Sequence, residues 1–224
     1  MKLTVIIPVY NEDQQFLELL DRVESVPVSK EIIVVDDGST NDLFKNIGEQ
    51  LANRDLIFLQ HDTNHGKGAA ICTALNHATG EVVIIQDADQ EYFPEDYSLL
   101  LKAYVENKVD AVYGVRDLKS RSIHMYYGNK FVTLLTNILY GGKLHDMETC
   151  YKLINRDVFK CLKLQSRRFD IEAEITAKLL LLRTKIVEVP IRYEPRREGK
   201  KLTVWDGIPT VVALIKCLPW KPNE

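Results

Sequence analysis

A regular alternation of short β-branched runs with helical segments in the first half of the chain constrains the fold most. The strands are expected at Leu3–Pro8, Ile32–Asp36, Leu56–Leu59, Val82–Gln86 and Ala111–Val115, and the helices at Phe16–Val23, Leu43–Leu51, Ala69–His77 and Tyr97–Glu106. The runs are almost continuously apolar, which indicates strands that are buried on both faces. Strands of this kind that alternate with helices predict a largely parallel sheet.

The second half keeps less of this alternation. Helices are expected at Phe131–Tyr140, Asp170–Leu182 and Asp206–Leu218, and a strand at Ile186–Tyr193. The chain has 224 residues, of which 46% are hydrophobic, so it has enough apolar material for one sizeable core. We therefore expect an α/β fold with a doubly wound, mostly parallel sheet that is flanked by helices, in a single domain over residues 1–224.

Charge and cysteine usage narrow the class of protein. A formal net charge of −3 argues against a nucleic-acid-binding protein, which is usually distinctly basic. The four cysteines show no CxxC spacing, which favours reduced thiols in a cytoplasmic protein. The apolar run at residues 1–8 is too short for a signal peptide, and no segment reaches the roughly 20 apolar residues that span a bilayer.

Polar and mostly acidic residues follow four consecutive expected strands. They are Pro8-Val9-Tyr10-Asn11-Glu12, Asp36-Asp37-Gly38-Ser39, Asn64-His65-Gly66-Lys67-Gly68 and Asp87-Ala88-Asp89-Gln90-Glu91. Parallel α/β sheets bind ligands at the carboxyl ends of their strands. Each group alone is more often a turn or a helix cap, and Asn11 could cap the first helix. Several carboxylates on one rim, however, repel each other and usually need a cation.

Two of these segments suggest specific chemistry. In an extended segment Asp87, Asp89 and Glu91 share one face, where they would bind Mg²⁺ or Mn²⁺ together with a diphosphate. Gly66-Lys67-Gly68 lacks the spacing of a Walker phosphate loop. We interpret it as a closely packed helix start from which Lys67 reaches the nucleotide.

The four strand-end segments together resemble the signature of the family-two inverting glycosyltransferases, which have the GT-A fold. Other segments resemble the branch of dolichyl-phosphate mannose and glucose synthases: Asp146–Lys152, Phe169–Lys178, Val189–Ile191, Glu198–Lys201 and Trp205–Gly207. The resemblance extends from Leu3 to Ile215. It implies a nucleotide-sugar-binding half at residues 1–115 and an acceptor-binding half at residues 116–224.

The resemblance also implies roles for individual residues. Pro8, Tyr10, Glu12 and Asp36 would hold the nucleoside, Asp87, Ala88 and Asp89 would face the diphosphate, and the metal ion would lie on Asp89 and Glu91. This sequence departs from the branch at two places. The synthases often carry Gln at the position of Glu91, which makes the site here more negative by one charge. The order Val204-Trp205-Asp206 also differs from the expected Trp-x-Asp, which puts a role of Trp205 in doubt.

The implied acceptor is a polyprenyl phosphate. Such a phosphate is already an anion, so it needs cationic residues to position it rather than a general base. The charged segment at residues 192–201 offers Arg196, Lys200 and Lys201 as a phosphate clamp, and Arg116 is a second candidate. The alternative for this segment is a solvated charged loop.

Asp146 lies where sugar-accepting relatives keep their catalytic base, so we assign it a catalytic role. With a phosphate acceptor it would instead orient cationic residues or the donor sugar. Two other functions stay open. One is transfer to a saccharide or protein hydroxyl with Asp146 as general base. The other is a non-catalytic nucleotide-sugar-binding subunit, which would not need to keep the whole acidic cluster.

The last expected helix carries apolar residues at helical spacing. They are Ile208, Val211, Val212, Ile215 and Leu218, which share one helix face. This face either packs on the enzyme's own core or lies on the membrane that holds a lipid acceptor. The expected partners are thus a nucleotide-sugar donor, a polyprenyl phosphate and, peripherally, the cytoplasmic face of a membrane.

Overall fold

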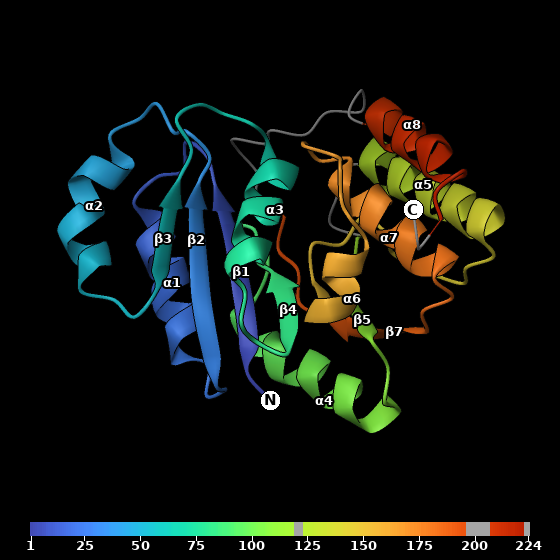
Figure 1. Cartoon of the computed structure of the whole chain (residues 1–224), viewed down its shortest axis with the longest axis horizontal. Helices are drawn as coiled ribbons and strands as arrows, with labels where there is room; N and C mark the ends of the chain where they lie inside the picture. Colours follow the sequence, from blue (N-terminus) through green and yellow to red (C-terminus); the bar gives the residue numbers. More distant parts are fainter. Residues whose placement is uncertain (119–122, 196–206, 222–224) are drawn as a thin grey trace.

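The computed structural model describes residues 1–118, 123–195 and 207–221. Its centre is a seven-stranded sheet with the strand order β3-β2-β1-β4-β6-β5-β7 (Figure 1). The strands are β1 (Leu3–Val9), β2 (Lys30–Asp36), β3 (Ile57–Gln60), β4 (Val82–Ile85), β5 (Ala111–Arg116), β6 (Lys152–Asn155) and β7 (Ile186–Ile191). This confirms a single α/β domain with a mostly parallel sheet.

Helices flank the sheet and connect its strands. They are α1 (Gln15–Ser25), α2 (Leu43–Ala52), α3 (Lys67–His77), α4 (Tyr97–Asn107), α5 (Ile123–Tyr140), α6 (Arg156–Cys161), α7 (Ile171–Leu181) and α8 (Gly207–Cys217), with a short 3₁₀ helix at Pro94–Asp96. Helix α3 packs on β1 and β2, whereas α5, α7 and α8 pack on one another beyond the β5 and β7 end of the sheet (Figure 1). None of the described helices is long and apolar enough to cross a bilayer.

The direction of the strands determines where the site can lie. Strands β1, β2, β3 and β4 pair in parallel, and so do β5 and β7. Strand β6 lies between β4 and β5 and pairs with both in the antiparallel sense. The loop that precedes β6 therefore reaches the same edge at which β1, β2, β4 and β5 end.

The central strands follow the predicted pattern. The residues of β4 are fully buried, as are most of those of β1 and β2, because helices cover both faces of the sheet. Gly66 shows why the Gly-Lys-Gly segment needs glycine. It has a positive φ of 97°, and a Cβ there would lie 2.3 Å from the backbone oxygen of Arg167. This confirms a closely packed start of α3.

Four elements of the second half differ from the sequence prediction. Strand β6 and helix α6 were not predicted, because β6 has only four residues and begins with a fully buried lysine, Lys152. Helix α5 begins at Ile123 rather than Phe131, since its first turns are half polar. Strand β7 ends at Ile191, and Tyr193 forms an isolated antiparallel bridge with Tyr92.

Candidate active site

The loops after β1 and β2 are hydrogen-bonded to each other. The backbone N–H of Asn11 donates to Oγ of Ser39 (2.9 Å), and Oδ1 of Asn11 accepts from the backbone N–H of Thr40 (2.8 Å). Asn11 therefore joins two loops and does not cap α1, whose N-cap is Gln14. The predicted donor-binding residues of β1 lie here, with Pro8 and Tyr10 half-buried and Glu12 buried.

Two neighbouring aspartates at the end of β2 have different partners. Asp36 accepts hydrogen bonds from the backbone N–H of Ser39 (2.9 Å) and from Nε2 of Gln60 (2.8 Å). Asp37 accepts from the backbone N–H groups of His65 (3.0 Å) and Gly66 (2.7 Å). Asp37 thus fixes the loop that delivers Lys67. The sequence analysis assigned a role only to Asp36, although Asp37 follows it directly and carries a second carboxylate at the same strand end.

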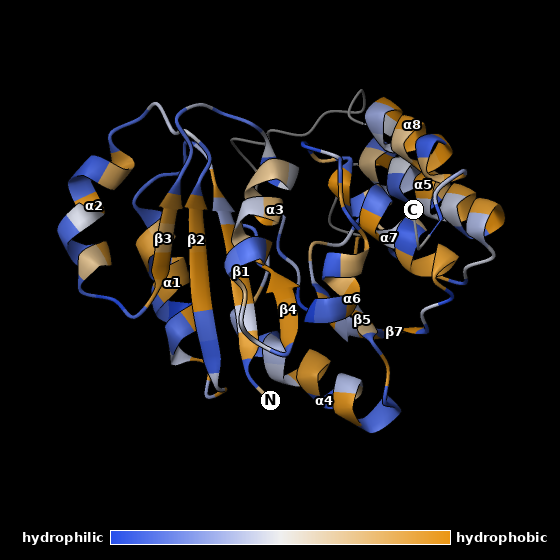
Figure 2. Cartoon of the chain, in the orientation of Figure 1, coloured by the Kyte–Doolittle hydropathy of each residue, from blue (hydrophilic) through white to orange (hydrophobic). Residues whose placement is uncertain are grey.

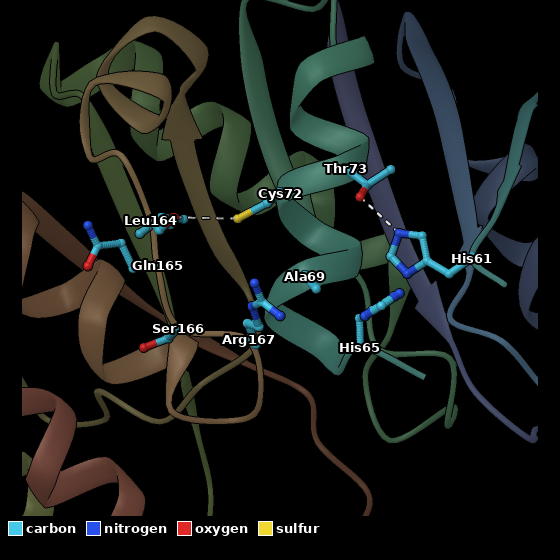
Figure 3. Close-up of a pocket in the computed structure, with 9 residues that line it drawn as sticks. All are labelled: His61, His65, Ala69, Cys72, Thr73, Leu164, Gln165, Ser166 and Arg167. Atoms are coloured by element: carbon cyan, nitrogen blue, oxygen red, sulfur yellow. Dashed lines mark hydrogen bonds between the residues drawn. The ribbon is translucent and has the colours of Figure 1, made fainter. Parts of the chain in front are cut away.

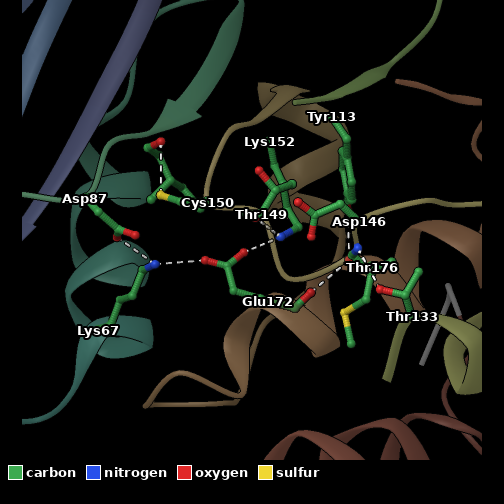
Figure 4. Close-up of polar contacts among 12 residues, drawn as sticks. Lys67, Asp87, Tyr113, Thr133, Asp146, Thr149, Cys150, Lys152, Glu172 and Thr176 are labelled. Carbon is green, nitrogen blue, oxygen red and sulfur yellow. Dashed lines mark hydrogen bonds and ion pairs between the residues drawn. The ribbon is translucent and has the colours of Figure 1, made fainter. Parts of the chain in front are cut away.

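A chain of buried ion pairs starts at Asp87 and crosses from the first half to the second (Figure 4). Nζ of Lys67 lies 2.7 Å from Oδ1 of Asp87 and 2.9 Å from Oε1 of Glu172 on α7. The other carboxylate oxygen of Glu172 accepts a hydrogen bond from Lys152. Burial lowers the pKa of Lys67, but the negative charges around it outweigh this effect, so its pKa is raised well above the ordinary value.

The segment from Asp87 to Glu91 is not extended as predicted. Residues 88–90 form a turn in which Gln90 has a φ of 60°, so alternate side chains do not share a face. The backbone N–H of Glu91 donates to Oδ1 of Asp89 (3.2 Å), and the Glu91 carboxylate accepts from the hydroxyl of Tyr193. Ala88, between the two aspartates, is buried.

A metal ion at these carboxylates would take part of its ligands from the substrate. In the part of the chain that the structure describes, no group of three or more His, Cys, Asp or Glu residues is arranged to hold a metal ion. Mg²⁺ usually takes one or two carboxylates and completes its shell with water and substrate phosphates. Asp87 and Asp89 follow β4 and are separated by one residue, and their carboxylates are the hard oxygen donors that this mode of binding uses.

Arg116 and Asp146 form a buried ion pair with two hydrogen bonds. Nε of Arg116 lies 2.7 Å from Oδ2 of Asp146, and Nη2 lies 2.8 Å from Oδ1. Nδ2 of Asn129 on α5 also donates to Oδ1 (3.0 Å). Burial raises the pKa of Asp146, but the Arg116 charge and these hydrogen bonds outweigh it and lower the pKa to about 2. Asp146 is therefore ionised at neutral pH, and its carboxylate holds the guanidinium of Arg116 in place.

Glu148 lies in the loop before β6, two residues after Asp146. Its Oε1 is buried and accepts or donates no hydrogen bond among the described residues. Burial raises the pKa of its carboxyl to about 7. Sequence reasoning did not assign Glu148 a role, because nothing in the sequence distinguishes it from a surface glutamate.

A separate hollow of about 590 Å³ lies between α3 and the segment at residues 164–167 (Figure 3). Residues that line it include His61, His65, Thr73 and Arg167. None of the residues that the sequence predicted for the site lines this hollow. The predicted residues that the structure describes lie instead at the strand ends and in two groups of ion pairs, one formed around Lys67 and the other by Arg116 and Asp146. Four further residues discussed for the site lie outside the described residues: Arg196, Lys200, Lys201 and Trp205.

Comparisons with known proteins agree with this arrangement. Residues 4–163 match the family described as Glycosyl transferase family 2. An uncharacterized protein of Methanocaldococcus jannaschii is 28% identical over 206 residues, which cover 87% of this chain and 89% of that protein. The undecaprenyl-phosphate 4-deoxy-4-formamido-L-arabinose transferase of Salmonella choleraesuis is 27% identical over an alignment of 228 residues, which covers 99% of this chain and 68% of that protein.

Solved structures share the fold at low sequence identity. Glucosyl-3-phosphoglycerate synthase from Mycobacterium tuberculosis, in complex with phosphoglyceric acid, superposes with a TM-score of 0.76 at 16% identity, covering 97% of this chain and 80% of that one. The same enzyme in complex with Mn²⁺, uridine diphosphate and glucosyl-3-phosphoglycerate gives a TM-score of 0.75. The chain therefore belongs to glycosyl transferase family 2, and its α/β domain has the GT-A fold.

Proposed function

We propose that this protein transfers one sugar, with inversion, from a UDP- or GDP-sugar to a polyprenyl phosphate at the surface of a membrane. The Salmonella relative, which aligns with 99% of this chain, is named as an undecaprenyl-phosphate sugar transferase. The GT-A neighbour from Mycobacterium tuberculosis was crystallised with Mn²⁺ and uridine diphosphate. The structural neighbour supports a nucleotide-sugar donor, and the Salmonella relative supports a lipid phosphate acceptor.

The donor would bind in the half formed by residues 1–115. Pro8, Tyr10, Glu12 and Asp36 would hold the nucleoside, while Lys67, Asp87, Ala88 and Asp89 would face the diphosphate. Mg²⁺ or Mn²⁺ would bind to Asp89 and Asp87 together with the diphosphate, and would neutralise charge on the departing diphosphate. Lys67 already lies 2.7 Å from Asp87, so it supplies a positive charge at the same place.

The acceptor phosphate would bind near Arg116 at the end of β5. Its guanidinium is held by Asp146, and Nη1 donates to the hydroxyl of Tyr92 (3.2 Å). The proposed clamp of Arg196, Lys200 and Lys201 lies outside the described residues. Asp146 has a pKa of about 2 and both oxygens engaged, so it is a poor general base. A phosphate acceptor does not need one.

The observation that carries the lipid acceptor is an exposed apolar face shared by α5 and α8, which pack against each other. Its members are Ile123, Tyr127, Phe131, Leu134 and Ile138 from α5, and Ile208, Val212, Ile215 and Leu218 from α8 and its end. Both helices lie at the end of the molecule away from α2, and their apolar residues are visible in Figure 2. Exposed apolar residues that gather on one face usually mark an interaction surface.

The charges on this α5–α8 face favour an anionic bilayer as its partner. Helices α5 and α8 contain two lysines, Lys130 and Lys216, and no aspartate or glutamate. The chain as a whole is acidic, with 32 acidic and 29 basic residues, so this distribution is not a consequence of composition. Apolar residues flanked only by lysines are typical of helices that lie flat on anionic lipids.

Helix α5 would connect the membrane to the site. One side of it presents Phe131 to the exterior, where the side chain is 60% exposed. The other side presents the buried Asn129, whose amide contacts Asp146. A lipid whose tail stays in the bilayer would therefore have its phosphate close to the residues that hold Arg116.

The proposal is tested by incubating the protein with Mn²⁺, a panel of UDP- and GDP-sugars and two kinds of acceptor. One is a short polyprenyl phosphate in vesicles, and the other is a mixture of saccharides and peptides. We expect a new glycolipid by mass spectrometry and no glycosylated saccharide or peptide. Product on the saccharide or peptide alone would contradict the proposal.

A specific observation favours a second candidate, transfer to a hydroxyl. Such a reaction needs a general base whose pKa lies near the working pH. Glu148, with a pKa of about 7, has that property, whereas Asp146 does not. For this second candidate, Glu148 would be the base in place of Asp146.

A further inference from the structure

Glu148 lies between the two groups of ion pairs that form the site. Because β6 is antiparallel to β4 and β5, the loop at residues 146–151 reaches the edge where those strands end. The charges that act on Glu148 come from both groups: Lys152 on β6 and Glu172 on α7 from one, and Arg116 on β5 and Asp146 from the other. The first group continues through Lys67 to Asp87 (Figure 4).

Glu148 lies between the proposed position of the donor diphosphate and that of the acceptor phosphate. In the proposed function, which this inference deepens, the diphosphate lies at Asp87 and Asp89 and the acceptor phosphate at Arg116. The sugar that moves from one to the other must lie between them. A side chain between the Lys152–Glu172 pair and the Arg116–Asp146 pair is thus placed to contact that sugar.

The polar atoms around this loop lack partners, and they are mainly acceptors. In the described part of the chain three buried side-chain atoms have no hydrogen-bond partner: Oε1 of Glu148, Oγ1 of Thr149 and Oδ1 of Asn129. Thr149 is the next residue in the chain, and Asn129 contacts Asp146 at the start of the loop. Buried polar atoms are rarely left unsatisfied in folded proteins, so their presence together points to a ligand that donates hydrogen bonds.

We propose that Oε1 of Glu148 accepts a hydrogen bond from a hydroxyl group of the transferred sugar and so determines which sugar the enzyme accepts. A sugar hydroxyl donates readily and carries no charge. A phosphate offers oxygen acceptors and negative charge, which a carboxylate and an amide oxygen would repel. The hydroxyl of the sugar is therefore the better match to this set of atoms.

The test measures donor binding without any acceptor, so its result does not depend on whether the acceptor is a lipid. Wild type, Glu148→Gln and Glu148→Leu are titrated calorimetrically with UDP and GDP, with UDP- and GDP-hexoses, and with monodeoxy analogues of the tightest hexose, all with Mn²⁺. The Glu106→Leu variant, on the exposed side of α4, is the control. Glutamine keeps an acceptor oxygen and nearly the same shape, so it preserves folding.

We expect the wild type to bind the hexose at least about 10-fold more tightly than one of its monodeoxy analogues, since losing a buried hydrogen bond costs about that much. Glu148→Leu should bind both equally, Glu148→Gln should keep most of the discrimination, and affinity for UDP or GDP alone should not change. Equal discrimination in wild type and Glu148→Leu would overturn the proposal. A parallel loss of nucleotide affinity would also overturn it, because the role would then be structural.

One further outcome identifies the second candidate function. If Glu148→Gln keeps donor affinity but loses turnover by more than about 100-fold at saturating donor, Glu148 acts as a general base. That result would overturn both the sugar-recognition role and the phosphate acceptor. Retained turnover of Glu148→Gln with a polyprenyl phosphate, together with loss of sugar discrimination in Glu148→Leu, supports both proposals. Retained turnover of Glu148→Gln together with wild-type discrimination in Glu148→Leu overturns only the inference about Glu148.

Discussion

The guanidinium of Arg116 donates two hydrogen bonds to the carboxylate of Asp146, from Nε over 2.7 Å and from Nη2 over 2.8 Å. The backbone N–H of Arg116 also donates to Oδ2 of Asp146 (3.2 Å). The end of β5 and the loop before β6 are thereby locked together. A cation held in one orientation can position an anionic acceptor with little further loss of entropy.

The first prediction concerns this pair. Asp146→Asn removes one charge and leaves Arg116 buried without its counter-ion, so we expect the free energy of unfolding to fall by roughly 3–5 kcal/mol. Folding depresses the pKa of Asp146 from 3.8 to about 2. The pair therefore stabilises the wild type above pH 3.8, and this stabilisation is lost as the pH falls toward 2. Urea unfolding at several pH values measures both effects, and an Asp146→Asn variant as stable as wild type would contradict them.

The second prediction concerns the metal. Asp89→Ala should abolish transfer and weaken Mn²⁺-dependent donor binding, because the carboxylate at this strand end is a proposed ligand of the ion. The melting temperature should change little, since Asp89 lies in a half-buried turn. Asp110→Ala, at an exposed position before β5, is the control. Full wild-type activity in excess chelator would exclude a role for the metal ion.

The third prediction concerns the raised pKa of Glu148. Folding raises this pKa from 4.5 to about 7, so the folded protein binds a proton that the unfolded chain releases between these values. The stability of the wild type should therefore fall as the pH rises from 4.5 to 7. In Glu148→Gln no buried carboxyl has to ionise, so this variant should be more stable than wild type at about pH 8, by up to about 3 kcal/mol. At about pH 4 the carboxyl of Glu148 is protonated, and the two proteins should be equally stable. A stability difference that does not vary with pH would contradict the raised pKa.

The fourth prediction concerns the α5–α8 face. A charge at its centre, as in Phe131→Glu or Val212→Glu, should reduce binding to anionic vesicles by at least about 10-fold, because an apolar side chain of this size contributes about 1.5–3 kcal/mol when buried. Val105→Glu replaces an equally exposed residue on α4 and should bind like wild type. Co-sedimentation at low and high salt measures the effect. Wild-type protein that stays in the supernatant at low salt would show that this face has another partner.

The sequence was sufficient to predict most of the fold because the first half obeys simple patterns. Strands β1, β2 and β4 are almost entirely buried, so their composition is dictated by the core. Strand β6 escaped prediction because tertiary contacts override its composition. Its first residue, Lys152, is fully buried only because Glu172 on α7 neutralises it, and that partner is 20 residues away in the chain.

The candidate site was only partly predictable for a related reason. Asp36, Lys67 and Asp87 follow strands, so their position at one edge could be predicted from the βα pattern. The roles of Glu172 and Asn129 depend on helices of the second half that pack against the sheet, and no local spacing encodes such contacts. Glu172 at the start of α7 makes a buried ion pair with Lys67, which lies 105 residues earlier in the chain.

The sequence left open whether the apolar residues of the last helix pack on the core or lie on a membrane, and the structure shows which of them are buried. Thr210, Ala213, Leu214 and Cys217 of α8 face the protein, whereas Ile208, Val212, Ile215 and Leu218 are exposed. Of the five residues of the apolar stripe, only Val211 packs partly against the core, and the other four are exposed. Its continuation on α5 was not predicted, because the first half of that helix was missed.

The most direct measurement compares two lipid acceptors that differ only in the phosphate. The protein is incubated with Mn²⁺, its nucleotide-sugar donor and vesicles that contain either a polyprenyl phosphate or the corresponding polyprenol, and the products are analysed by mass spectrometry and by NMR of the anomeric proton. We predict glycosylated polyprenyl phosphate with inverted anomeric configuration and no product from the alcohol. Glycosylation of the polyprenol at a similar rate, or retention of configuration, would contradict the proposed function.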